Sequence, residues 1–160
     1  MIRAALAALF LCAACGGALA GEDAAATLLM KVNAIRLVQG LPPVSSDAEL
    51  TRAAQRHAEE IAARGELSHT GLDGARIGDR LDRVGYPYAL AVENLASGTL
   101  DADDTLERWL GSPGHRVNLL SAAIRQAGVG YIEVPAPDWR IAYRSYWVLV
   151  LARPASEPGS

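Results

Sequence analysis

The sequence predicts an α+β fold, a three-layer α-β-α sandwich around a small antiparallel sheet. Helical periodicity dominates the first two thirds of the chain, whereas stretches rich in aromatic and β-branched residues come late, at 128–134 and 146–151. This order lacks the regular alternation that a doubly wound parallel sheet requires. The stretch 146–151 is apolar at every position, which indicates a strand covered on both faces. Helices are therefore expected on both sides of the sheet.

Two amphipathic segments predict the first two helices. Apolar residues recur at helical spacing between residues 24 and 40, where a glycine and two prolines follow. A second helix is expected to begin after an Asp47 cap and to end near Gly65. His57 lies in its apolar stripe. We expect this residue to be a core histidine with a satisfied hydrogen bond.

Two further helices are expected before the strands. Asp73 is predicted to cap a third helix, which Gly85 closes. A fourth helix begins with aspartates from Asp101 onward, which suit the positive N-terminal end of a helix. It is expected to stop at 111–114, and a short helical turn is expected to restart at His115.

The N-terminus has the pattern of a signal peptide, expected at residues 1–20. Arg3 precedes a short apolar run, and Ala18-Leu19-Ala20 supplies a cleavage site of the A-x-A type. Cys15 offers a competing site, because its surroundings are similar to a bacterial lipoprotein box. We prefer ordinary secretion, and either alternative predicts an exported protein. No later segment is long and apolar enough to span a bilayer.

The rest of the chain is expected to form one domain at 21–154, followed by a frayed tail at 155–160. Both cysteines, Cys12 and Cys15, precede this domain, so no disulfide framework is expected. Stability must then come from an ordinary apolar core. The formal net charge of −3 and the lack of a basic run argue against a nucleic-acid partner.

Short motifs follow one another along the chain in a characteristic order. They are Asn33-x-x-Arg36, Ser68-His69, Gly85-Tyr86, Glu93-Asn94-Leu95-Ala96, Trp109-Leu110-x-Ser112-Pro113-Gly114-His115-Arg116-x-Asn118, Gly128-Val129-Gly130 and Tyr146-Trp147. Together they resemble the bacterial branch of the CAP superfamily, which includes cysteine-rich secretory, antigen 5 and pathogenesis-related 1 proteins. The resemblance covers about residues 28–152. It implies a three-layer sandwich, an extracytoplasmic location and a central cleft lined by histidines and acidic residues.

The resemblance also implies the residues of that cleft. Eukaryotic members carry two histidines and two carboxylates there, which in some members bind a divalent metal. His69 matches the first histidine and Glu93 matches the glutamate of the Glu-Asn motif. Ser112 stands where the second glutamate is expected, and Tyr146 where the second histidine is expected. His115 belongs to the Ser-Pro-Gly-His motif of the bacterial branch, and that likeness alone assigns it to the cleft.

Two imidazoles and one carboxylate are a legitimate ligand set for zinc or another divalent metal. His69, Glu93 and His115 are therefore candidate metal ligands. The alternative is a hydrogen-bonded polar cluster in which Glu93 orients an imidazole. A nucleophilic role for Ser112 is disfavoured, because the sequence has no Gly-x-Ser-x-Gly elbow to expose the hydroxyl.

Two classes of function follow from these residues. We expect a non-enzymatic binding module for a small lipid, peptide or cell-envelope ligand, with or without a weakly held divalent metal. The loss of half the family's tetrad favours this hypothesis. The alternative is a metal-dependent hydrolase of peptide or cell-wall bonds, in which Tyr146 or Ser112 assists the metal site.

Overall fold

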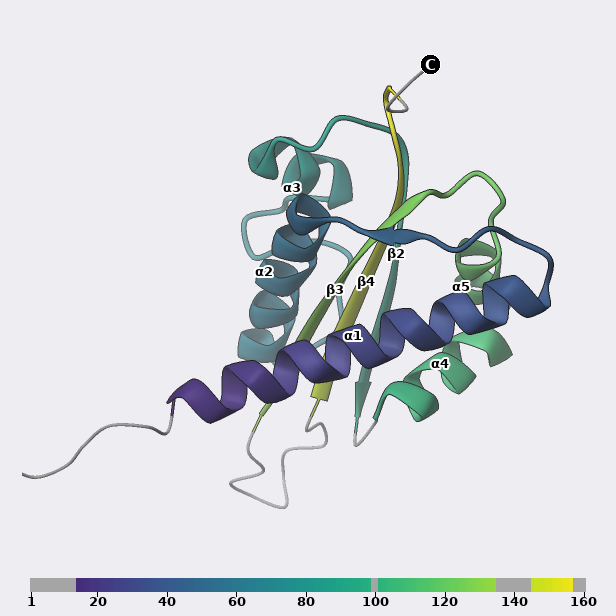
Figure 1. Ribbon diagram of the computed structural model, residues 1–160. Coiled ribbons are helices and arrows are strands. Elements are labelled where there is room, and N and C mark those ends of the chain that lie inside the picture. Colours follow the sequence, from purple (N-terminus) through teal and green to yellow (C-terminus); the bar gives the residue numbers. More distant parts are fainter. Residues whose placement is uncertain (1–13, 99–100, 135–144, 157–160) are drawn as a thin grey trace, which may run out of the picture.

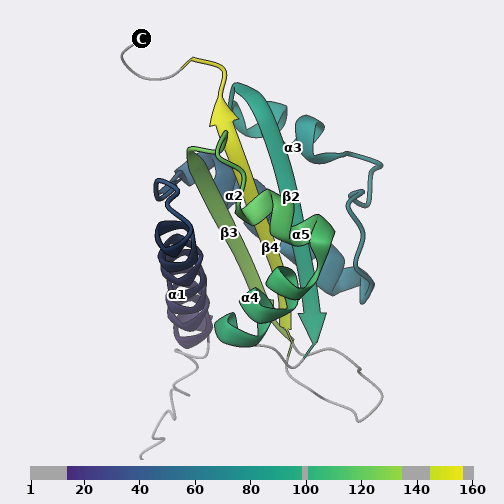
Figure 2. The same cartoon turned by 90° about the vertical axis from the view of Figure 1, so that its right-hand side faces the viewer.

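The computed structural model describes residues 14–98, 101–134 and 145–156 (Figure 1). The elements, in chain order, are α1 (Ala14–Val38), β1 (Ser45–Ser46), α2 (Ala48–Arg64), α3 (Ile77–Val84), β2 (Tyr88–Gly98), α4 (Ala102–Gly111), α5 (Pro113–Leu119), β3 (Gln126–Glu133) and β4 (Ser145–Pro154). Helices α4 and α5 lie in front of the sheet in Figure 2, and α2 lies behind it. The predicted α+β class with helices on both faces is confirmed.

The four strands form one sheet in the order β1-β3-β4-β2. Strand β4 pairs antiparallel with both β2 and β3, while the short β1 pairs parallel with β3. Glu93 lies opposite Val150 and Asn94 lies opposite Leu149. Strand β2 therefore forms one edge of the sheet, at the right in Figure 2.

Strand β4 separates two apolar cores. Trp147 and Leu149 belong to the core beneath α1, α4 and α5, whereas Val148 and Val150 belong to the core beneath α2 and α3. This alternation follows from the two-residue period of a strand. The whole stretch 145–152 is buried, as expected for a strand covered on both faces.

The predicted caps of two helices are confirmed. The Asp47 carboxylate accepts a hydrogen bond from the Leu50 N–H at the start of α2, and Gly65 ends that helix in the left-handed conformation. Asp101 caps α4 in the same way by accepting from the Asp104 N–H.

The predicted start of α3 is wrong. Asp73 does not cap this helix, because its carboxylate accepts from the Ala75 N–H and closes a turn two residues on. The helix begins at Ile77, and Asp79 accepts from the Arg76 N–H. Likewise, α5 begins at Pro113 rather than at His115, since proline suits the first position of a helix.

Strand β2 has no counterpart among the predicted elements. Three of its 11 residues are alanines, which have weak strand propensity, and Glu93 and Asn94 interrupt its apolar pattern. Because the local sequence has little strand propensity, the strand depends on its pairing with β4. The strand matters for function because it carries Glu93.

Residues 1–13 of the expected signal peptide, including Cys12, lie outside the described residues, as do residues 157–160 of the expected tail. None of the helices in the described part of the chain combines the length and apolarity needed to cross a membrane.

Candidate functional site

Glu93 is the centre of a buried polar cluster. Its side chain is 3% exposed, and each carboxylate oxygen has a partner. Oε2 accepts a hydrogen bond from Arg80 at 2.6 Å, and Oε1 lies 2.9 Å from Nδ1 of His69. Nε2 of His57 lies 3.9 Å from the same Oε1. Strand β2, helix α3, helix α2 and the loop at 65–76 therefore converge on one carboxylate.

Arg80 fixes the loop that carries His69. The guanidinium is buried and donates through NH1 to the carbonyls of Ala75 and His69, at 3.0 and 3.2 Å. Its NH2 donates to Glu93. A buried charge is tolerated only when it is paired and hydrogen-bonded, and this network meets both conditions. Arg80 is not among the site residues predicted from the sequence. One feature of the sequence could have indicated it: Arg80 is a charged residue next to Leu81, within the apolar stripe of an amphipathic helix.

His57, on helix α2, contacts the same loop. The ring is fully buried, with Nε2 2.8 Å from the Ser68 carbonyl oxygen and Nδ1 3.3 Å from Oε2 of Glu60. Because a carbonyl only accepts, Nε2 carries the hydrogen. The prediction of a core histidine with a satisfied hydrogen bond is confirmed. His57 also holds in place the turn that presents His69, which the sequence did not reveal.

His69 presents the accessible part of the cluster. Its side chain is 64% exposed, although Nδ1 is bonded to Glu93. That hydrogen bond, helped by the negative charge of Glu93, raises the pKa of His69 against the opposing effects of burial and Arg80. Nε2 of the ring has no hydrogen-bond partner among the described residues, so it is free for a ligand.

His115 has the opposite electrostatic environment. Burial, and secondly the charge of His69, lower its pKa. Its Nδ1 is buried and has no hydrogen-bond partner in the described part of the chain. The ring lies beside Trp109, with 6.5 Å between centroids, and the main-chain oxygen accepts from Asn94 at 3.1 Å. The two histidines therefore interact through space without sharing Glu93.

The geometry gives no support to a metal at His69, Glu93 and His115. No three or more His, Cys, Asp or Glu side chains within the described residues are arranged to hold a metal ion. Arg80 already occupies one oxygen of Glu93, and a guanidinium repels a cation. As these residues stand, they do not fit a divalent metal.

Two other candidate residues lie apart from Glu93. Ser112 joins α4 to α5, where its N–H donates to the Trp109 carbonyl. Tyr146 is 2% exposed in the core beneath α2 and lies opposite Ser97, four positions along β2 from Glu93. Neither residue lines the two pockets described next.

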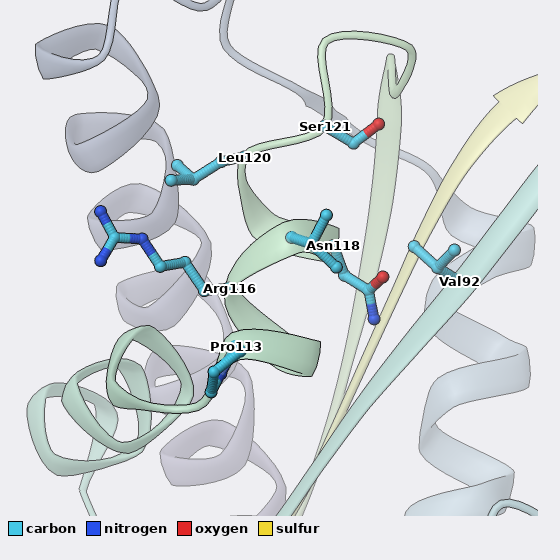
Figure 3. A pocket seen from close by; sticks show the side chains of 7 residues that line it. Val92, Pro113, Arg116, Asn118, Leu120 and Ser121 are labelled. Carbon is cyan, nitrogen blue, oxygen red and sulfur yellow. The ribbon is translucent and has the colours of Figure 1, made fainter.

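Two pockets lie beside β2. The first, called the His69 pocket, measures about 290 Å³ and is lined by His69, Thr70, Arg76, Ile77 and Glu93. The second, called the α5 pocket, measures about 520 Å³ and has a mainly apolar lining from β2, α5 and the residues after α5 (Figure 3). Its lining consists of Val92, Pro113, Arg116, Val117, Asn118, Leu120 and Ser121.

The fold and these residues have counterparts in known proteins. The sequence profile of the cysteine-rich secretory protein family (CAP) matches residues 29–151. The chain belongs to this family. The resemblance stated from the motifs is thereby confirmed, and the CAP family also accounts for the three-layer architecture.

Bacterial proteins are among the relatives of this CAP chain. It is 31% identical over 101 residues to YkwD and 31% identical over 103 residues to the membrane protein YlbC, both from Bacillus subtilis. These matches cover 63% and 64% of the chain but only 39% and 30% of the two relatives. The chain thus matches less than half the length of either.

Solved structures give the same picture. An extracellular protein with an SCP domain from Bacillus anthracis is similar with a TM-score of 0.72 and 27% identity, over 83% of this chain and 41% of that one. An outer surface protein of Borrelia burgdorferi shares the fold, with a TM-score of 0.68 and 21% identity, over 79% and 90% of the two chains.

Proposed function

We propose that this CAP domain is a non-enzymatic binding module that acts outside the cytoplasm, and that its His69 pocket takes an acidic group of a peptide or cell-envelope ligand. The observation that carries the proposal is the neutralisation of Glu93 by Arg80 inside the site. With that charge offset, the lining of the pocket presents His69 and Arg76 as cationic groups.

The chemistry of the lining suits an acidic ligand. Nε2 of His69 becomes a donor when the ring is protonated, and the raised pKa favours that form. Arg76 adds a fixed positive charge, and Thr70 adds a hydroxyl. Hydrogen bonds between charged groups are about twice as strong as neutral ones. A carboxylate in this pocket would therefore find several donors, with Glu93 screened by its own partners.

The environment favours binding over catalysis. The Ser68 hydroxyl donates to the Thr70 carbonyl and accepts from the Thr70 N–H, so it is held in its turn. Both carboxylate oxygens of Glu93 are engaged, one by Arg80 and the other by His69. No observation favours the hydrolase alternative. An extracytoplasmic location draws support from the extracellular Bacillus anthracis relative.

A pair of short peptides tests this function. Acetyl-Gly-Asp-Gly-amide and its Asn counterpart are titrated into the ¹⁵N-labelled protein at pH 6 and followed by NMR. We expect saturable shifts at His69, Thr70 and Arg76 with the Asp peptide, and much weaker binding of the Asn peptide. Saturable binding of both peptides with equal affinity, or of neither, would contradict the proposal.

Variants identify the site of binding. His69→Gln and Arg76→Gln should each weaken binding of the Asp peptide about 10–150-fold, the range expected for loss of a hydrogen bond to a charged group. Arg83→Gln is a matched control. Arg83 lies on α3, which directly follows Arg76, but it is exposed and paired with Asp73, and it does not line the pocket. This control should bind as the wild type does.

A further inference from the structure

The edge strand β2 is covered along only part of its length. Side chains of α4 and α5 donate to three of its carbonyls, at alternate positions along the strand. The pairs are Asn118 with Glu93, Trp109 with Leu95, and Arg108 with Ser97, at 3.5, 2.9 and 3.5 Å. Because main-chain groups of a strand alternate between its two edges, these three carbonyls define the outer edge. Helices α4 and α5 therefore close the edge from Glu93 onward.

The preceding part of β2 is more open. Residues 89–92 are exposed or half-buried, whereas residues 93–97 are buried. By the same alternation, Ala91 directs its N–H and carbonyl to the outer edge, and among the described residues no side chain caps it. Unpaired main-chain groups on a sheet edge are a template for an added strand.

The two pockets lie on either side of this open segment. Val92 lines the α5 pocket and Glu93 lines the His69 pocket. These residues are consecutive, so their side chains lie on opposite faces of the sheet. Consecutive side chains of a strand added at this edge would likewise project to opposite faces. One would approach the His69 pocket and its neighbour would approach the α5 pocket.

We infer that the outer edge of β2 at Ala91 binds an extended peptide by strand addition, with an acidic side chain in the His69 pocket and the adjacent apolar side chain in the α5 pocket. This inference rests on the proposed function, which supplies the acidic subsite. The α5 pocket suits a large apolar side chain because Val92, Pro113, Val117 and Leu120 line it, and Val117 is 66% exposed. Main-chain hydrogen bonds give affinity in this mode, and the pockets give specificity.

Spacing is the feature that tests the inference. Three blocked peptides are compared by NMR titration: one with Asp and Leu adjacent, one with a glycine between them, and one with Asp alone. The first two are made in both orders, since the added strand can run in either direction. We expect the adjacent pair to bind about tenfold tighter than Asp alone, the gain expected from burial of one large apolar side chain. The spaced pair should show little gain.

Two controls isolate the strand and the apolar subsite. N-methylation of the peptide amides should remove the gain, because it removes the main-chain donors. Val117→Ser should reduce the gain while leaving the binding of Asp alone unchanged, and the exposed position of Val117 makes misfolding of this variant a small risk. Shifts at Val92 and Val117 should appear only with the adjacent pair.

The outcomes separate the two proposals. Equal affinity of the adjacent and spaced peptides, or a gain that survives N-methylation, would overturn strand addition while leaving the acidic subsite intact. A failure of Asp alone to bind would overturn the proposed function itself.

Discussion

Arg80 and Glu93 form a buried ion pair, with 2.6 Å between NH2 and Oε2 and with both side chains less than a tenth exposed. The pair joins α3 to the edge strand β2. It also leaves the second carboxylate oxygen of Glu93 for His69. The position of the accessible His69 ring therefore depends on the buried charge of Arg80.

Removal of Arg80 alone should be costly. Arg80→Met leaves the carboxylate of Glu93 buried without its cation, and such losses typically reduce the free energy of unfolding by about 3–5 kcal/mol. Urea denaturation measures this change. The double variant Arg80→Met/Glu93→Gln should be more stable than Arg80→Met, because the remaining buried group is then neutral. Equal or lower stability of the double variant would mean that the ion pair is not what stabilises this junction.

Stability should respond to pH in opposite directions through the two histidines. The pKa of His69 is raised in the folded state, so its contribution is fully present below its unfolded value of 6.5 and is lost as pH rises through the higher folded value. The charged and titratable groups that act on it are Glu93, Arg80 and His115. The free energy of unfolding of the wild type, relative to that of His69→Gln, should therefore decrease as pH rises.

The pKa of His115 is lowered in the folded state, so the sign is reversed. As pH falls below 6.5, His115 is protonated in the unfolded chain before it is protonated in the folded protein. The folded state therefore loses stability until pH falls below the folded-state pKa of His115. Denaturation of wild type and His115→Gln between pH 5 and 8 measures the difference, which should favour the wild type increasingly as pH rises. A flat or opposite dependence would contradict the burial assigned to this ring.

Added zinc should not stabilise the protein. A divalent ion at His69 and Glu93 would have to displace the guanidinium of Arg80 or lie next to it, and within the described part of the chain His115 does not complete a three-ligand group with them. We expect no rise in melting temperature with equimolar Zn²⁺ after treatment with a chelator. Stoichiometric zinc after purification, together with stabilisation that His69→Ala abolishes, would instead support a metal site at these residues.

Local sequence signals predicted much of the fold but not the strand that carries the site. The caps at Asp47 and Asp101 and the apolar run 146–151 are local features, and the structure has them as predicted. Strand β2 is different, since its pairing with β4 joins residues about 55 positions apart and nothing in its own composition demands a strand.

The candidate site was predicted only where a motif marked it. His69 and Glu93 were identified by resemblance, and the structure brings them into contact. Arg80 escaped notice because its burial depends on a carboxylate 13 residues away, which sequence periodicity does not reveal. Tyr146 was assigned to the cleft by its position in a motif. Its place in the core follows from the strand alternation that sets it on the α2 side of β4.

The close approach of α2 to β3 should not tolerate a larger residue at Gly128. A Cβ there would overlap the backbone of Leu50 and Thr51, which cannot move without shifting the helix. We expect Gly128→Ala to lower the free energy of unfolding by at least about 2 kcal/mol, an effect of overpacking. Gly114→Ala is the matched control, because nothing lies within 4 Å of its added Cβ. Gly114 is helical, so alanine there should stabilise the protein by about 0.5–1 kcal/mol. Urea denaturation distinguishes the two, and a mild effect at Gly128 would mean that α2 and β3 pack less tightly than these atoms indicate.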